Sequence, residues 1–157
     1  MSIPVIYDTM VFLQAASRPE RIHATFQAIR DRRVTLYLSA EILAEVQDVL
    51  NRQSVRAKFP ALTPQVVRAF IADVLANATV IDPVPRVFTW PQHPDDDHLF
   101  NAAIAAQARH LVTWETRLIK LGTDTTPAAN LLRQLAPPLT IITPRQLADA
   151  IRLPTGP

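Results

Sequence analysis

Short apolar runs rich in β-branched residues alternate with longer amphipathic segments along almost the whole chain. Runs of this length, bounded by polar or turn-forming residues, predict buried strands rather than helices. The five runs occupy residues 3–7, 34–38, 79–81, 110–113 and 139–142. Strands that alternate with helices predict a mainly parallel sheet that is covered on both faces. We therefore expect an α/β fold built on a mainly parallel five-stranded sheet.

Capping residues place most of the intervening helices. Ser39 is a typical N-cap for a helix over 40–51, and a threonine followed by proline is typical of a helix start at residues 63–64, 126–127 and 143–144. Gly122 is expected to stop a short helix that begins at 116. Further helices are predicted over about 97–108 and from Ser17–Glu20 to Arg30. The segment 9–13 is interpreted only as a short apolar stretch.

The overall composition favours one globular domain. Hydrophobic residues make up 48% of the 157 residues, and we expect a single domain over 1–151 with a disordered tail over 152–157. Cysteine is absent, which excludes disulfides and thiolate metal sites. No stretch approaches the ~20 apolar residues of a membrane span, and no basic segment precedes the first apolar run. We expect a soluble, cytoplasmic protein.

Charge and glycine content narrow the classes of ligand. The net charge is only +2, but the basic residues are nearly all arginine, with clusters at 30–33 and 52–58. Guanidinium groups suit phosphate, although the simpler interpretation of any single cluster is a solvated surface. The chain has only two glycines, Gly122 and Gly156, which excludes the glycine-rich phosphate loops of nucleotide-binding folds.

Four acidic residues follow or begin predicted elements where ligands bind in open α/β sheets. Asp8 ends the first strand and Glu115 follows the fourth, whereas Glu45 lies at the edge of the apolar face of its helix and Asp97 lies in the first turn of another. Carboxylates that converge in this way are typical of sites for Mg²⁺ or Mn²⁺, which prefer oxygen ligands. Two such ions can activate a water and stabilise the leaving oxygen of a phosphodiester.

The residues of the predicted metal site also have simpler, structural interpretations. Asp95 or Asp96 is most simply a helix N-cap, and each acid taken alone is more often structural than functional. No Ser/His/Asp or Cys/His arrangement competes as a catalytic centre. The four histidines show no metal-ligand spacing and are interpreted as surface or loop residues; they are His23, His93, His98 and His110.

The order and context of the acids resemble the PIN-domain nucleases over nearly the whole chain. The matching motifs are Val-Ile-Tyr-Asp-Thr at 5–9, the segment from Ser39 through Glu45 to Leu50, Pro-Asp-Asp-Asp-His at 94–98, Leu-Val-Thr-Trp-Glu at 111–115, and Ile-Ile-Thr-Pro-Arg at 141–145. The chain is particularly similar to the branch of toxin components from toxin–antitoxin systems. The resemblance implies a three-layer α/β/α sandwich, a four-acid metal site and hydrolysis of RNA.

The resemblance assigns roles position by position. Asp8, Glu45, Asp97 and Glu115 would be the catalytic and metal-binding acids, with Mg²⁺ or Mn²⁺ as the cofactor. Supporting residues would be Thr9, Thr113, Asn101 and Asp96; residues that bind substrate cannot be assigned. Two positions depart from the family pattern: Glu115 stands where aspartate is more common, and Met10 stands where asparagine is common. Methionine cannot make the polar contacts that orient a ligand.

Three functions remain open at this point. The first is a metal-dependent endoribonuclease, the toxin of a toxin–antitoxin pair, with RNA and an antitoxin protein as partners and a homodimer as the expected assembly. The second is a degenerate PIN fold that binds RNA or a protein without cutting, which Met10 and Glu115 favour. The third is an unrelated doubly wound protein with an acidic pocket, such as a phosphotransfer or phosphatase domain. Such domains place paired acids around the first strand, whereas this chain has Asp8 alone there.

Overall fold

A single five-stranded sheet forms the centre of the molecule in the computed structural model, which describes residues 2–152. The strand order is β3-β2-β1-β4-β5, and every neighbouring pair is parallel. The strands are β1 (Ile3–Tyr7), β2 (Val34–Ser39), β3 (Thr79–Ile81), β4 (His110–Val112) and β5 (Thr140–Ile142). The predicted parallel five-stranded sheet is confirmed.

The connections on the two sides of β1 run in opposite directions across the sheet. From β1 the chain moves outward through β2 to β3, then returns to β4 on the other side of β1 and moves outward to β5. The register pairs Ile3 with Val34 and Tyr7 with Val112. In open α/β sheets the crevice at such a reversal, beyond the carboxyl ends of the strands, is the usual place for a ligand.

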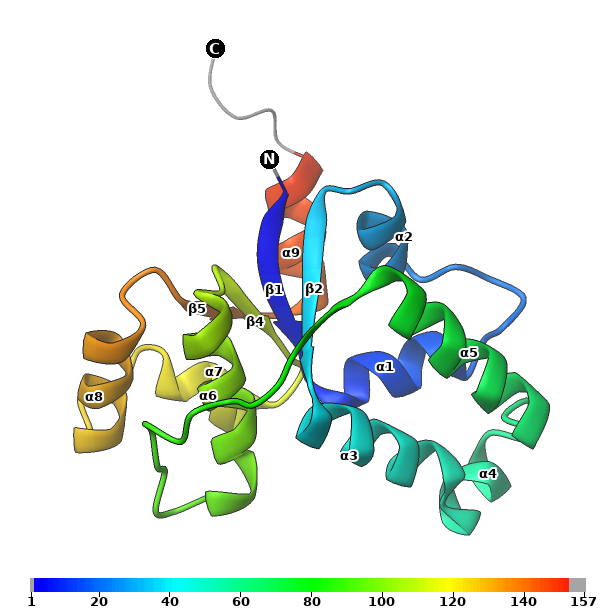
Figure 1. Cartoon of the computed structure of the whole chain (residues 1–157), viewed down its shortest axis with the longest axis horizontal. Coiled ribbons are helices and arrows are strands. Elements are labelled where there is room, and N and C mark those ends of the chain that lie inside the picture. The colour runs from blue at the N-terminus through cyan, green and yellow to red at the C-terminus, as the bar shows by residue number, and fades with distance from the viewer. Residues whose placement is uncertain (1, 153–157) are drawn as a thin grey trace.

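Helices cover both faces of the sheet and make three layers (Figure 1). In that view α6, α7 and α8 lie on one side of the strands, and α1, α2 and α5 lie on the other. The helices are α1 (Thr9–Ala16), α2 (Ala24–Arg30), α3 (Ala40–Asn51), α4 (Gln53–Lys58), α5 (Pro64–Asn77), α6 (Asp97–Ala106), α7 (Thr116–Leu121), α8 (Pro127–Leu135) and α9 (Pro144–Arg152), with a 3₁₀ turn η1 (Pro94–Asp96) before α6.

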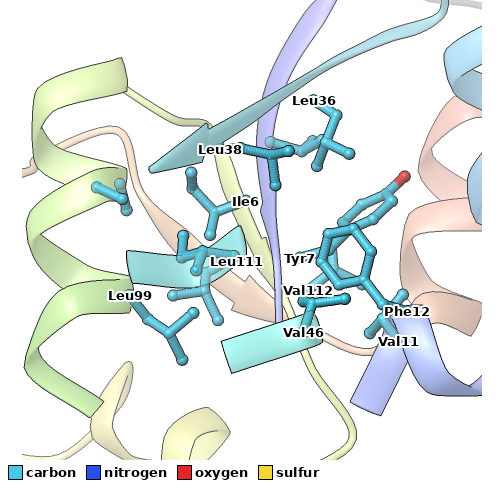
Figure 2. Packing of buried hydrophobic residues seen from close by; sticks show 14 of the residues in the cluster. Ile6, Tyr7, Val11, Phe12, Leu36, Leu38, Val46, Leu99, Leu111 and Val112 are labelled. Atoms are coloured by element: carbon cyan, nitrogen blue, oxygen red, sulfur yellow. The ribbon is translucent and has the colours of Figure 1, made fainter. Parts of the chain in front are cut away.

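Side chains on β1 alternate between the two layers, as the pleat of a strand requires. Figure 2 shows Ile6 directed toward Leu99 of α6, and Tyr7 directed to the opposite side, toward Phe12 of α1. Both β1 residues are fully buried. The Tyr7 hydroxyl also donates a hydrogen bond of 2.6 Å to the carbonyl of Thr25, so its polar end is satisfied inside the core. The packing on both faces fixes the carboxyl end of β1.

The chain between β1 and β2 differs from the sequence prediction. The apolar stretch after Asp8 forms helix α1, and Ser17 is its C-cap rather than the start of the next helix. Helix α2 begins only at Ala24, with His23 as its N-cap. Five of the eight α1 residues are buried apolar side chains, so the segment lacks the polar face that usually reveals a helix. The Ser39 cap, in contrast, is confirmed by the bond from the Ile42 amide to the Ser39 hydroxyl at 3.0 Å.

Helix α6 begins at Asp97 as predicted and ends at Ala106, two residues early, because Gln107 adopts the left-handed conformation with φ 51°. The predicted disordered tail over 152–157 lies outside the described residues, except for Arg152, which ends α9. Among the described residues, no helix has the length and apolar character needed to cross a membrane.

Candidate active site

Asp8 lies buried at the reversal point of the sheet. It follows β1 directly and serves as the N-cap of α1, so strand pairing and helix capping both hold it in place. Its Oδ1 accepts a hydrogen bond from the Thr9 amide at 2.7 Å, and its Oδ2 accepts one from the Thr113 hydroxyl at 2.9 Å. Only 5% of the residue is exposed. Both donors are uncharged, so neither of them neutralises the carboxylate.

The surroundings of Asp8 disfavour its charged form. Burial raises the pKa of Asp8 to about 6, because a carboxylate removed from water loses its solvation. The hydrogen bonds from Thr113 and Thr9 oppose this rise, whereas the negative charges of Glu115 and Glu45 add to it. The structure therefore brings three of the predicted acids within electrostatic range of one another at one end of the sheet.

Glu45 is held by a histidine that the sequence interpretation treated as a surface residue. Nε2 of His98 in α6 lies 2.7 Å from Oε2 of Glu45 in α3. This hydrogen bond is the main reason that the pKa of Glu45 is lowered. Burial alone would lower the pKa of His98, but the bond and the charge of Glu45, with help from the Asp95 backbone and Glu41, outweigh burial and raise it. The one signal in the sequence was that His98 directly follows Asp97 at a helix start.

Glu115 shares an arginine with Asp96. Nη1 of Arg117, in the first turn of α7, lies 2.7 Å from Oε2 of Glu115, and Nη2 lies 2.9 Å from Oδ2 of Asp96. The Asp96 side chain is only 15% exposed. The hydrogen bond to Asp96 and the charges of Asp96, Glu115 and Asp8 all raise the pKa of Arg117. Arg117, which the sequence analysis did not single out, is thus a cation placed among three acids.

Thr113 and Thr9 are the polar residues that support the acids. The buried Thr113 hydroxyl donates to Asp8 and accepts a hydrogen bond of 3.0 Å from the Glu115 amide, so it fixes the two acids relative to each other. The Thr9 hydroxyl is buried beside the site, close enough to Glu45 to help lower the pKa of that acid, but makes no hydrogen bond of good geometry with residues 2–152. A buried hydroxyl in this state is costly unless it meets a further partner, such as water or a ligand.

Asp97 and Asn101 bind the segment that precedes α6. Oδ1 of Asp97 accepts a hydrogen bond of 2.7 Å from the Trp90 amide. The side chain of Asn101 accepts bonds from the amides of Val87 and Phe88 and donates one to the Phe88 carbonyl. Both residues therefore hold residues 87–90 against α6. In this conformation it is Asp96, rather than Asp97, that joins the ion pairs beside Glu115.

Met10, two residues after Asp8, lies in the wall of a hollow. It is 44% exposed and lines a cavity of about 480 Å³ formed by α1, the connection from α1 to α2, and Phe59. Leu13 and Phe59 provide apolar walls, and Arg18 and Arg21 provide positive charge. The methionine thus belongs to the wall of this hollow, where an apolar side chain packs without an unmet polar contact.

The donor set fits a hard divalent cation in kind. Asp8, Glu45 and Glu115 supply carboxylate oxygens, and Oε2 of Glu115 is buried without a hydrogen bond of good geometry from residues 2–152. The described side chains nevertheless form no group of three Asp, Glu or His residues arranged to hold an ion. Binding a metal would require His98 to release Glu45, or Arg117 to release Glu115.

Comparison with known proteins agrees with this geometry. Residues 4–117 match the model of the family described as PIN domain, a match that includes all four predicted acids and Arg117. The search of curated proteins found no match.

Proposed function

Since the chain belongs to the PIN-domain family and has its nuclease-type fold, we propose that it is an Mg²⁺- or Mn²⁺-dependent endoribonuclease. Members of the family are in general metal-dependent nucleases. The proposal adds the substrate, RNA, and the residues: Asp8, Glu45, Asp97 and Glu115 as the acids that would hold the metal.

The buried carboxylate of Asp8, whose direct hydrogen-bond partners are both uncharged, is the observation that carries the proposal. A rise in pKa from 3.8 to about 6 corresponds to about 3 kcal/mol against the charged form. Structural carboxylates seldom retain such a cost, whereas functional sites often do. A divalent cation would offset it by pairing with Asp8 and weakening the repulsion from Glu45 and Glu115.

The chain's own residues would position the reacting groups. The Thr9 amide and the Thr113 hydroxyl fix the Asp8 carboxylate at the tip of β1. His98 orients Glu45 and can hold a proton at Nε2. When bound, the divalent ion supplies a water of lowered pKa for attack on the phosphodiester. The hollow beside Met10 carries two arginines, Arg18 and Arg21, which suit the phosphates of an RNA strand that approaches the acids.

The biological setting is a further part of the proposal. The resemblance to toxin components favours a cytoplasmic toxin that cuts RNA, is neutralised by an antitoxin protein and forms a homodimer. Mass spectrometry under native conditions tests the dimer. Growth arrest on expression, relieved by a cognate partner, tests the toxin role.

Cleavage of single-stranded RNA with Mn²⁺ or with EDTA tests the central proposal. We expect cleavage by the wild type only with the metal, and none by Asp8→Asn, which keeps the size of the side chain but removes its charge. Asp48→Asn is the control, because Asp48 lies on the exposed face of α3 and pairs with Arg52. Equal cleavage by the two variants would show that Asp8 is not a catalytic ligand.

A fold that binds RNA without cutting is the second candidate. The observation in its favour is that Glu115 and Asp96 are already paired with Arg117, and Glu45 with His98. Under this alternative, RNA binding in a gel-shift assay would be the same with Mn²⁺ and with EDTA, and the RNA would remain intact in both.

A further inference from the structure

We infer that Arg117 is a built-in counter-cation of the acid pocket, and that it must release Glu115 before a divalent metal can bind there. The inference rests on the proposed metal site and adds a residue that determines its affinity. It assigns to α7 a role in controlling the site, in addition to its packing against the sheet.

The geometry places the guanidinium in direct competition with a metal. Nη1 of Arg117 lies 2.7 Å from Oε2 of Glu115, one of the oxygens that a metal would need. A metal–oxygen bond measures ~2.0–2.2 Å, so the same oxygen cannot keep this close contact and bind an ion from the same direction.

The charges show why the protein keeps an arginine here. Asp8, Glu115 and Asp96 each act on Arg117 and stabilise its positive charge. Without a metal, these acids would repel one another with less compensation. Arg117 cannot lose its charge by deprotonation, because guanidinium stays charged at every physiological pH. Arg117 can therefore yield to a metal only by moving.

Movement of Arg117 is possible because its head is not enclosed. Its side chain is 46% exposed, whereas that of Asp96 is 15% exposed and Oε2 of Glu115 is buried. The acids therefore stay in place while the long, flexible arginine can swing into water. An RNA phosphate near the site would be an alternative partner for the released guanidinium.

Direct Mn²⁺ binding, measured by the loss of the free-ion signal in electron paramagnetic resonance, tests the inference without any activity assay. Arg117→Gln removes the charge and keeps most of the side-chain length, and we expect it to bind Mn²⁺ about tenfold more tightly than the wild type. Arg117→Lys retains a cation and should stay close to the wild type.

Arg30→Gln is the matched control. Arg30, at the end of α2, pairs with Asp73 at 2.8 Å and its side chain is 45% exposed, so Arg30→Gln removes a comparable ion pair that includes none of the candidate acids. Its Mn²⁺ affinity should equal that of the wild type. Thermal unfolding gives a second measurement: in EDTA Arg117→Gln should melt below the wild type, and Mn²⁺ should raise its melting temperature by the larger increment.

The possible outcomes distinguish a failure of the role of Arg117 from a failure of the metal site itself. Equal Mn²⁺ affinity for the wild type and Arg117→Gln would overturn the role of Arg117 and leave the metal site intact, since Arg117 would then be only a structural clamp. Failure of both proteins to bind millimolar Mn²⁺ would overturn the metal site itself, and the inference with it. Binding by Arg117→Gln alone would support the inference most strongly.

Discussion

Nε2 of His98 lies 2.7 Å from Oε2 of Glu45 and joins the first turn of α6 to the middle of α3. The two residues are 53 positions apart in the sequence. The contact connects an acid of the candidate site to a group that titrates near neutral pH, so the stability of the metal-free protein should depend on pH.

The His98 pair should stabilise the metal-free protein mainly below neutral pH. The folded-state pKa of His98 is raised by Glu45, with smaller contributions from the Asp95 backbone and Glu41. The stability that the pair contributes is fully present below the unfolded pKa of about 6.5 and is lost as pH rises through the folded pKa. Calorimetry in EDTA should show a melting temperature that falls above pH 6.5, and His98→Gln should flatten that fall.

His110→Gln is the control for this prediction, because burial lowers the pKa of His110 and its effect on the pH dependence of stability has the opposite sign. An unchanged slope in His98→Gln would exclude the pair as its source.

Asp8→Asn should make the metal-free protein more stable at neutral pH. The pKa of Asp8 is about 6 in the folded protein, above its ordinary value of 3.8, so the charged form is disfavoured and stability is lost as pH rises from about 4 to 6. The amide keeps the acceptor for the Thr9 amide, and the Thr113 hydroxyl can accept from its NH₂ group. We expect a gain of up to about 3 kcal/mol at pH 7.5, which is several degrees in melting temperature, and a gain of only about 1 kcal/mol at pH 4.5. Melting curves in EDTA at the two pH values measure it; a loss of stability at pH 7.5 would contradict the assigned cost of Asp8.

Mn²⁺ should stabilise the wild type more at pH 7.5 than at pH 5.5. Metal binding needs the charged form of Asp8, which is largely protonated below its pKa of about 6. At 100 times the dissociation constant, a ligand adds about 2.7 kcal/mol to the free energy of unfolding. Melting temperatures with and without millimolar Mn²⁺ at both pH values test the expectation. An equal increment at both, or one that persists in Asp8→Asn, would point to a metal site elsewhere.

Two substitutions of Asp97 separate a structural role from metal binding. Asp97→Asn keeps the Oδ1 acceptor for the Trp90 amide, whereas Asp97→Ala removes it and leaves that amide without its partner. We expect a loss of about 1–3 kcal/mol for the alanine variant and little change for the asparagine variant in denaturant unfolding. If Asp97 is also a metal ligand, as the sequence predicts, Asp97→Asn should lose Mn²⁺ affinity while it keeps its stability. Unchanged Mn²⁺ affinity in Asp97→Asn would confine Asp97 to the structural role.

The sequence alone determined the sheet and most helix starts. The central strands β1, β2 and β4 are largely buried runs, and buried parallel strands need continuous apolar residues whatever their neighbours are. The edge strands β3 and β5 are more exposed than the sequence predicts, because each pairs with only one neighbouring strand. Ser39 and the Thr63–Pro64 pair act through bonds within one helical turn, so their effect is readable locally. Helix α1 was not predicted because most of its side chains are buried, so its sequence lacks the alternating apolar and polar faces that indicate a helix. The single domain over 1–151 stays a prediction.

The sequence also identified Asp8, Glu45 and Glu115, because parallel strands and the helices that follow them bring their ends to one edge of the sheet. Only the tertiary structure decided the partners of these acids. His98 meets Glu45, Arg117 meets Asp96, and Asp97 turns to the Trp90 amide, through contacts that depend on how α3, α6 and α7 pack. Side-chain direction at a helix start is set by long-range packing rather than by local periodicity. The pattern of residues therefore predicted which acids gather at this edge of the sheet, while the packing of distant elements determined the partners and the charge balance of those acids.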